Sequence, residues 1–351
     1  MTSEDEPARG APTRTRMFAE AEEAPRAVER QLRDNREIMA DIARSLRRIS
    51  PRAVVTGARG SSDNAATYAK YLIETKLGIL TSSAAPSISS VYSARTDLHD
   101  VVFLAMSQSG RSPDLLASLV AAKRAGAFTV AFVNVESSPL ACLADAVVPL
   151  HAGPELSVAA TKSFIATNVA IAHLAATWLE DDVLLKALNE LPKFLAKAWQ
   201  FDWGAAVTRL KSAHDLYVIG RGLGFGTAQE AALKFKETCS LHAEAFSAAE
   251  VMHGPMALIK DGFPVFVMSQ ADETRDSINE LIGRFTTNHA DILLAGFSHP
   301  QATVLPTLAA NPILEPILFI QSFYRMAEAL SRARGLDPDS PPHLNKVTET
   351  V

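Results

Sequence analysis

An internal repeat restricts the fold of this 351-residue chain more than any other feature. Short apolar runs and polar turns alternate along residues 53–149, and a second series with the same texture follows along residues 216–306. The spacing agrees as well, because Gly57 precedes Ser107 by 50 residues and the corresponding distance in the second series is 49. The matching segments are 53–61 with 216–224, 102–110 with 265–273, 129–135 with 292–298, and 146–149 with 303–306. The chain is therefore expected to hold two copies of one folding unit in tandem.

Each copy alternates apolar runs with helical stretches. In the first copy, the run VVFLAM at 101–106 is followed by a polar turn and then by a helical stretch from Pro113 to Arg124. Strands that alternate with helices are typical of parallel βαβ units, and strands that are apolar throughout are typical of a sheet covered on both faces. The predicted fold class is therefore α/β, with two tandem domains that each hold a parallel sheet flanked by helices in a flavodoxin-like αβα sandwich.

The same patterns predict the domain boundaries. Apolar residues recur at helical spacing between Val28 and Leu46, which predicts a helical segment. Residues 1–16 have neither that spacing nor the apolar region of a signal peptide, so we expect a mobile extension there. The expected organisation is an extension at 1–16, a helical segment at 17–50, a first domain at 51–180, a connecting helix at 181–203, a second domain at 204–335 and a tail at 336–351.

The charge balance and the apolar pattern argue against two classes of partner. The chain has 34 basic and 39 acidic residues, a net charge of -5, and no basic stripe of the kind that binds nucleic acid. Its longest apolar stretches, such as Asn168 to Leu179, are shorter than the roughly 18 residues that a membrane span needs. We therefore expect a cytoplasmic protein that binds neither nucleic acid nor membrane.

Metal and nucleotide cofactors are not expected either. The two cysteines, Cys142 and Cys239, have no neighbours at metal-ligand spacing. The glycine-rich turns at 57–62 and 220–226 lack the G-x-G-x-x-G order, and no acidic residue follows about 20 positions later to hold a ribose.

The turn SQSGRS at 107–112 predicts an anion site. It follows an apolar strand and opens a helix, where backbone N–H groups and the helix dipole favour a phosphate, and its three serines add hydroxyl donors. The alternative is an ordinary helix cap with spare serines. The second copy reads SQADET, in which Asp272 and Glu273 would repel a phosphate. We therefore expect one phosphate site per chain, in the first copy.

The densest polar cluster lies at 229–255. On a helix, Glu230, Lys234 and Glu237 fall on one face, and His253 follows near a Gly-Pro pair. The plain interpretation is a solvated helix with an ion pair. The alternative is a cleft in which a carboxylate and a histidine move protons between carbon and oxygen.

Near the C-terminus, Lys346 is a third candidate. A terminal lysine is usually just solvated, but Leu344 and Val347 would let the tail dock. A docked Lys346 could supply the amine of a Schiff base.

Together, GARGSS, SQSGRSPDLL, GPELSVAATKSF, the 229–258 block and LNKVTETV resemble, in this order, the SIS (sugar isomerase) family of phosphosugar-binding domains. The resemblance runs from about Met17 to Val351. Within the family it extends to the isomerase half of glucosamine-6-phosphate synthases and, more closely, to stand-alone SIS-type glucosamine-6-phosphate deaminases. The implied phosphate ligands are Ser107, Gln108, Ser109 and Ser112. The implied sugar contacts are Ser62 and the backbones of Val158 and Asn345.

The resemblance also implies catalytic roles. Glu237 matches the glutamate that moves a proton between carbon 1 and carbon 2. His253 matches the histidine that opens the sugar ring, which in this family comes from the neighbouring subunit of a homodimer. Lys346, in a tail that completes the active site, matches the lysine that forms an imine with the ketose, and Lys234 and Glu230 match residues that flank the proton-transfer site.

The departures from the synthase pattern favour one reaction. Thr2 follows Met1 where the synthase has a nucleophilic cysteine, and about 50 residues precede the first SIS unit, so we expect no glutamine hydrolysis. Ala160 replaces a sugar-contacting serine, and Arg111 replaces a glutamate. The expected reaction is glucosamine 6-phosphate plus water to fructose 6-phosphate plus ammonia. The alternatives are another phosphosugar isomerase, an aminotransferase subunit that borrows ammonia from a partner, and a phosphosugar sensor without catalysis.

Overall fold

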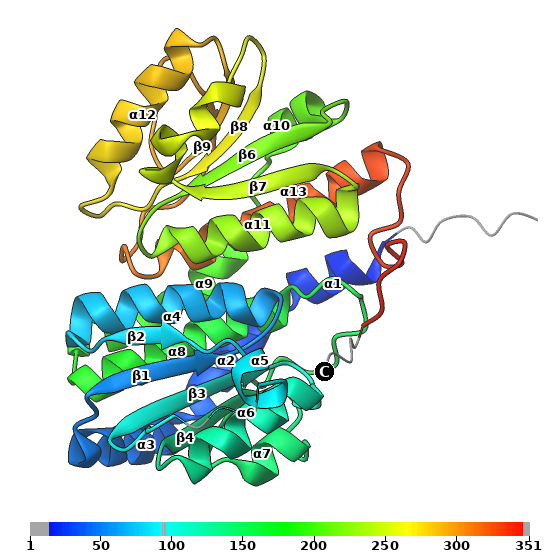
Figure 1. Ribbon diagram of the computed structural model, residues 1–351. Coiled ribbons are helices and arrows are strands. Elements are labelled where there is room, and N and C mark those ends of the chain that lie inside the picture. Colours follow the sequence, from blue (N-terminus) through cyan, green and yellow to red (C-terminus); the bar gives the residue numbers. More distant parts are fainter. Residues whose placement is uncertain (1–13, 93, 95, 347–351) are drawn as a thin grey trace, which may run out of the picture.

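Two parallel five-stranded sheets, each flanked by helices, make up the computed structural model, which describes residues 14–92, 94 and 96–346 (Figure 1). This architecture confirms the predicted α/β class. Most of the expected N-terminal extension, residues 1–13, lies outside the described residues, as do the last five residues of the tail. Within the described part of the chain, no helix is long and apolar enough to cross a lipid bilayer.

The two sheets share one topology. The strands of the first sheet are β1 Ala53–Gly57, β2 Thr81–Ser83, β3 Val101–Ser107, β4 Phe128–Val133 and β5 Ala146–Pro149. Those of the second are β6 Asp215–Gly220, β7 His242–Ser247, β8 Pro264–Met268, β9 Asp291–Ala295 and β10 Thr303–Leu305. The first sheet has the order β2-β1-β3-β4-β5, and the second has the order β7-β6-β8-β9-β10 when it is read from the matching edge. The structural repeat therefore follows the sequence repeat at four strand pairs, and the edge strands β2 and β7 add a fifth pair that the sequence repeat did not include.

The helices surround both sheets and fill the space between them (Figure 1). Those of the first part of the chain are α1 Arg16–Glu22, α2 Ala24–Asp34, α3 Arg36–Ile49, α4 Ser61–Leu77, α5 Ser87–Ser90, α6 Pro113–Arg124, α7 Pro139–Leu143 and α8 Lys162–Leu179. The segment expected to connect the two domains contains α9 Asp182–Ala198. The remaining helices are α10 Gly204–Leu210, α11 Gly224–Cys239, the 3₁₀ turns η1 Glu250–His253 and η2 Pro255–Leu258, α12 Arg275–Thr287 and α13 Glu315–Ala333.

The N-terminal helical segment is divided into three helices. Pro25 lies in the first turn of α2, where its missing N–H is tolerated, but its ring could not sit inside a helix continued from α1. Asn35 separates α2 from α3, and its buried side chain donates a hydrogen bond of 2.7 Å to the carbonyl of Pro149. The breaks let the segment wrap around the first domain.

Helices α4 and α11 pack against each other between the two sheets, and buried residues of both domains form one continuous apolar core. Gly226 of α11 makes the close approach possible, because a Cβ there would lie 2.4 Å from the carbonyl oxygen of Asn64. On the same helix as Asn64, Tyr68 donates a hydrogen bond of 2.9 Å to the carbonyl of Ile313. The packing of α11 on α4 places Glu237, near the end of α11, at the cavity of the first domain.

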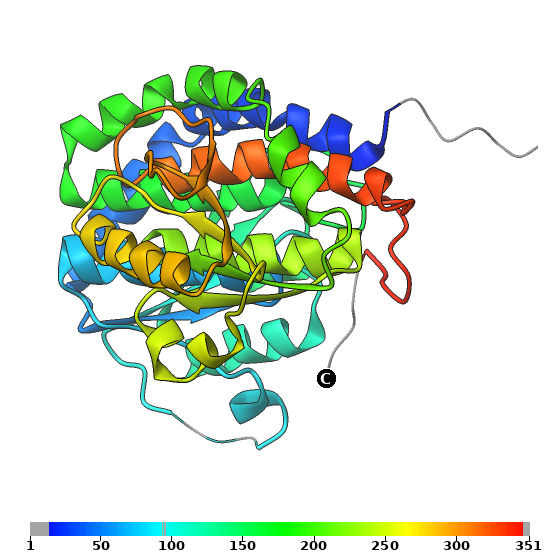
Figure 2. The same ribbon diagram turned by 90° about the horizontal axis from the view of Figure 1, so that it is seen from above.

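Hydrogen bonds join the start of α1 to the tail that follows α13. After α13, the tail passes the start of α1 (Figure 2). There the carboxylate of Asp339 accepts hydrogen bonds from the backbone N–H groups of Arg16, at 2.7 Å, and Met17, at 2.8 Å. A carboxylate at a helix N-terminus satisfies free N–H groups and complements the helix dipole.

Candidate active site

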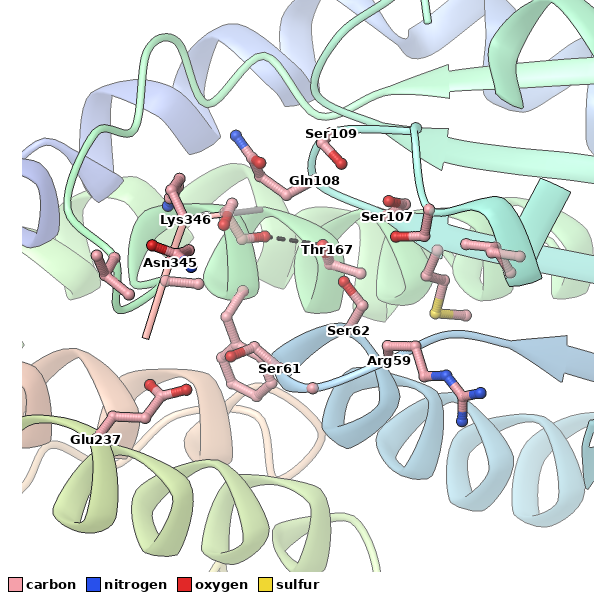
Figure 3. A pocket seen from close by; sticks show the side chains of 18 of the residues that line it. Arg59, Ser61, Ser62, Ser107, Gln108, Ser109, Thr167, Glu237, Asn345 and Lys346 are labelled. Carbon is pink, nitrogen blue, oxygen red and sulfur yellow. Dashed lines mark hydrogen bonds between the residues drawn. The ribbon is translucent and has the colours of Figure 1, made fainter. Parts of the chain in front are cut away.

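A cavity of about 370 Å³ opens at the carboxyl ends of β1 and β3. The strand order reverses between these two strands, and in open α/β sheets such a point is where ligands bind. The first domain, the end of α11 and the tail all contribute to its wall (Figure 3). Of the residues predicted from sequence, those that line the cavity are Ser62, Ser107, Gln108, Ser109, Ser112, Val158, Glu237, Asn345 and Lys346.

The turn between β3 and α6 has the form of an anion cradle. Ser107 Oγ accepts a hydrogen bond of 3.0 Å from the N–H of Gly110. Gly110 has a φ of +64°, and a Cβ there would lie 2.2 Å from Ser138 Oγ, so only glycine fits. Ser112 occupies the N-cap position of α6, yet its side chain makes no capping hydrogen bond. The helix-cap alternative therefore does not account for its hydroxyl, which lines the cavity with that of Ser109.

The matching turn in the second domain is filled by its own side chains. Gln270 Nε2 donates hydrogen bonds to the carbonyl of Arg221 at 2.9 Å and to Asp272 Oδ2 at 2.7 Å. Thr274, the N-cap residue of α12, donates its N–H to Asp272 at 2.9 Å. A Cβ on Gly224 would lie 2.4 Å from Gln270 Oε1, which shows how closely this amide fills the turn. The Gln270 side chain thus takes the space that an anion would need in this turn, and one phosphate site per chain stays a prediction.

The turn after β1 contributes Arg59 and links the two domains. Arg59 lines the cavity, and its Nε donates a hydrogen bond of 2.8 Å to the buried carboxylate of Asp114 at the start of α6. Ser61, the first residue of α4, donates a hydrogen bond of 3.1 Å to Glu230 of α11. Sequence reasoning missed Arg59 and Ser61, although both stand inside the GARGSS motif and flank a glycine with positive φ, Gly60.

Three titratable residues of α11, namely Glu230, Lys234 and Glu237, lie along one face of the helix. Glu237 lines the cavity with a side chain that is 21% exposed, while Lys234 and Glu230 are buried behind it. Lys234 Nζ contacts the carboxylate of Glu237, lies 3.3 Å from Glu230 Oε1, and donates a hydrogen bond of 3.1 Å to Ser61 Oγ. Tyr324 of α13 donates a further hydrogen bond to Glu230 at 3.1 Å. The burial of Glu230 and Lys234 excludes the solvated-helix interpretation.

Burial and charge decide the protonation of this group. Burial opposes the charged form of Lys234, but the carboxylates of Glu230 and Glu237 raise the pKa of its ammonium above the ordinary value. Burial raises the pKa of Glu230, against the opposing effect of Lys234. Lys234 therefore stays a cation beside the carboxylate that faces the cavity.

The tail reaches the cavity beside Gln108 of the cradle (Figure 3). Lys346 Nζ lies 3.2 Å from Oε2 of the buried Glu155, a residue that sequence reasoning did not single out. Burial by itself would raise the pKa of Glu155, but Lys346 and the donors of Thr161 and Ser163 hold that pKa below its usual value. The predicted docking of Val347 lies outside the described residues.

His253 is placed apart from these residues. It is an exposed residue of η1 and does not line the cavity. The structure is that of a single chain, so service of His253 in a neighbouring subunit stays a prediction. In the described ranges, no cluster of three or more His, Cys, Asp or Glu side chains could hold a metal ion.

The chain matches a protein-family model, curated proteins and solved structures. The SIS domain model matches residues 48–177 and 209–299. The glutamine–fructose-6-phosphate aminotransferases (isomerizing) of Thermococcus kodakarensis and Aeropyrum pernix are 32% and 35% identical, over 94% and 86% of this chain. The chain covers 57% and 51% of those proteins, so it spans just over half their length.

Solved structures match over nearly the whole chain. A Silicibacter pomeroyi protein assigned as a phosphosugar isomerase is 42% identical, with a TM-score of 0.89 over 93% of this chain and 100% of that one. The C-terminal domain of glucosamine-fructose-6-phosphate aminotransferase from Francisella tularensis is 24% identical and shares the fold, with a TM-score of 0.85 over 95% of this chain and 100% of that one. Glucosamine-6-phosphate deaminase from Thermotoga maritima also shares the fold, at 21% identity and a TM-score of 0.76 over 96% of this chain and 100% of that one.

Proposed function

The chain belongs to the SIS domain family and carries two SIS domains in tandem, and on this premise we propose that it is a phosphosugar isomerase. The observation that carries the proposal is that one cavity holds both a hydroxyl-rich helix N-terminus, at Ser107–Ser112, and a carboxylate with a buried cationic partner, Glu237 with Lys234. The names of the relatives support the same class of reaction, because they describe isomerizing enzymes that act on a sugar phosphate.

The cradle would bind the phosphate of the substrate. The hydroxyls of Ser109 and Ser112 offer donors to an anion, and the dipole at the start of α6 favours its charge. The sugar carbons would then extend across the cavity toward α11. Ser62, at the turn after β1, and the segment at Val158 line the space between.

Glu237 would carry the proton. In aldose–ketose isomerisation the carboxylate removes the proton from carbon 2 of the open-chain aldose, and the electron pair of that bond forms the double bond of an enediol as the carbonyl oxygen gains a proton. Return of a proton to carbon 1 and loss of the proton on oxygen 2 gives the ketose, so no atom is gained or lost. The Lys234 ammonium contacts the Glu237 carboxylate and would fix it in place for this work.

A second reaction is favoured by a specific observation, the docking of Lys346 in the same cavity. With an aminosugar phosphate, the same proton transfer yields a ketose imine at carbon 2. The Lys346 amine can displace ammonia from that carbon, and water then releases the ketose and restores the amine. The net reaction is glucosamine 6-phosphate plus water to fructose 6-phosphate plus ammonia.

A pure sensor is the remaining alternative. It would need the cradle but not a buried lysine between two carboxylates, and burying such charges is costly unless each is paired. The paired group of Lys234, Glu230 and Glu237 therefore favours catalysis over binding alone.

Two assays run side by side separate these functions. The purified protein would be incubated with hexose 6-phosphates, with isomer formation followed by chromatography, and with glucosamine and galactosamine 6-phosphates, with ammonia release followed by a coupled assay. Isomer formation supports the first proposal, and ammonia release supports the second. Tight phosphosugar binding without either product would favour the sensor and overturn both.

A further inference from the structure

The carboxylate of Glu155 is buried and accepts four hydrogen bonds. It accepts hydrogen bonds from the N–H groups of Thr161, at 3.0 Å, and Ser163, at 3.1 Å, and from Ser163 Oγ at 2.6 Å. These three donors belong to the start of α8. The fourth, Lys346 Nζ at 3.2 Å, comes from the tail, 191 residues along the chain.

The four donors differ in how firmly they are held. Backbone N–H groups at a helix N-terminus cannot move without disturbing the helix, so they fix the position of the Glu155 carboxylate. The Lys346 side chain is 25% exposed and belongs to a segment outside every helix and strand of the described chain. The carboxylate is therefore the fixed partner of this ion pair, and the lysine is the movable one.

We propose that Glu155 is the positioning residue of Lys346, which fixes the ammonium at the cavity and thereby holds the segment from Leu344 to Lys346 in the cavity wall. The proposal rests on the proposed function in so far as Lys346 is the amine that meets the sugar. Glu155 does not line the cavity, so it acts through Lys346 and not on the substrate.

Glu20 provides a matched control. Its carboxylate is also buried and accepts hydrogen bonds from the next two backbone N–H groups of the same loop, those of Leu156 and Ser157. Glu20 makes no hydrogen bond or ion pair with Lys346. Glu20→Gln therefore alters the same loop and removes a charge that acts on Lys346 only through space, but it leaves the contact between Glu155 and Lys346 in place. Glu155→Gln keeps an acceptor for α8 and turns an amide N–H₂ toward the ammonium.

The reactivity of Lys346 tests the pair without any sugar. Wild-type protein, Glu155→Gln and Glu20→Gln would be treated with formaldehyde and cyanoborohydride, and the methylation of Lys346 followed by mass spectrometry. Loss of a hydrogen bond to a charged partner frees the ammonium, so Glu155→Gln is expected to speed the methylation roughly tenfold or more. Glu20→Gln, which removes a charge near Lys346 but no contact with it, should change the methylation rate much less than Glu155→Gln does. Equal rates in wild type and Glu155→Gln would overturn the proposal.

A second readout keeps the two proposals distinguishable. Borohydride reduction in the presence of fructose 6-phosphate should join the sugar to Lys346 in wild type. The labelling should be much weaker in Glu155→Gln, because an amine that is no longer held at the cavity reacts faster with free formaldehyde but does not meet the bound sugar. If wild type is not labelled, the imine step fails, but the methylation rates still report on Glu155.

If Glu155→Gln does not fold, Lys346→Met tests the pair from the tail. Hydrogen–deuterium exchange at residues 344–346 should then be faster than in wild type. Unchanged exchange would show that the tail is held by other contacts and would also overturn the proposal.

Discussion

Asn64 of the first domain and Glu230 of the second are joined by a hydrogen bond of 2.9 Å, from Asn64 Nδ2 to Glu230 Oε2. The bond crosses the contact between α4 and α11, where Gly226 allows the two helices to meet. Glu230 in turn neighbours Lys234, which contacts the carboxylate that faces the cavity. The packing of the two domains and the placement of the proposed base therefore depend on one polar group.

Replacing Asn64 tests this dependence. Asn64→Ala leaves an oxygen of the fully buried Glu230 without one of its donors, which should lower the free energy of unfolding by about 1–3 kcal/mol. Urea denaturation measures this change. Thr75→Ala, in the last turns of the same helix, removes an exposed hydroxyl that bonds only within α4 and should change stability by less than about 0.5 kcal/mol. Equal effects of the two substitutions would show that the bond contributes nothing across the interface.

The phosphate cradle can be tested against its counterpart in the second domain. Ser112 and Thr274 occupy matching N-cap positions, but only Ser112 lines the cavity. Loss of a hydroxyl donor to a charged phosphate should cost about 1.5–3 kcal/mol, so Ser112→Ala should raise KM for a phosphosugar about ten- to a hundredfold. Thr274→Ala should leave KM unchanged. A rise in KM for Thr274→Ala and none for Ser112→Ala would move the phosphate to the second domain.

His173 makes stability depend on pH. Burial in α8, with Arg36 nearby, lowers the pKa of His173 to about 4, whereas an unfolded histidine titrates near 6.5. Between these values the unfolded chain binds more protons than the folded one, so the free energy of unfolding falls as the pH drops from about 6.5 to 4, by roughly 3 kcal/mol for this group. His173→Leu should remove that part of the fall, and the exposed His214→Gln should not. Urea denaturation at pH 7 and pH 4.5 compares them, and parallel curves for wild type and His173→Leu would contradict the prediction.

Complementation between inactive chains tests whether His253 serves a neighbouring subunit. His253→Ala and Glu237→Ala chains should each be inactive alone. In a mixed dimer, one site combines Glu237 from the first chain with His253 from the second, so activity should return on mixing under conditions where subunits exchange. The exposure of His253 on η1, away from the cavity of its own chain, agrees with this arrangement. Exchange without any recovery would assign His253 to its own subunit or to no site.

The helix and strand on either side of the cradle can be predicted from local sequence, but some other elements of the fold cannot. Helix α6 runs from Pro113 to Arg124 as predicted, because an apolar strand, a turn and a helix are consecutive there. The edge strand β7 was not predicted, since HAEAFS at 242–247 is rich in alanine and charge and poor in the β-branched residues that mark strands. Only pairing with β6 makes it a strand.

Some residues of the candidate site can likewise be predicted from local sequence, and others cannot. Ser107, Ser109 and Ser112 are neighbours in sequence, so their meeting at a helix N-terminus could be predicted. Glu155 could not be predicted, because its partner Lys346 lies 191 residues away and its burial depends on the tertiary fold. A glutamate in the segment before an apolar helix was the available signal, but many such glutamates only cap the helix.

Exchange of carbon-bound hydrogen with solvent tests the central claim, proton transfer by Glu237 on a phosphosugar. Wild-type protein, Glu237→Gln and Glu244→Gln, an exposed residue of β7, would be incubated with fructose 6-phosphate and other hexose 6-phosphates in ²H₂O and followed by NMR. We predict deuterium at carbon 1 of a ketose or carbon 2 of an aldose with wild type and Glu244→Gln. Glu237→Gln should exchange about 10²–10⁴-fold more slowly while still binding the sugar. Exchange by Glu237→Gln at the wild-type rate, or binding without exchange by wild type, would contradict the account.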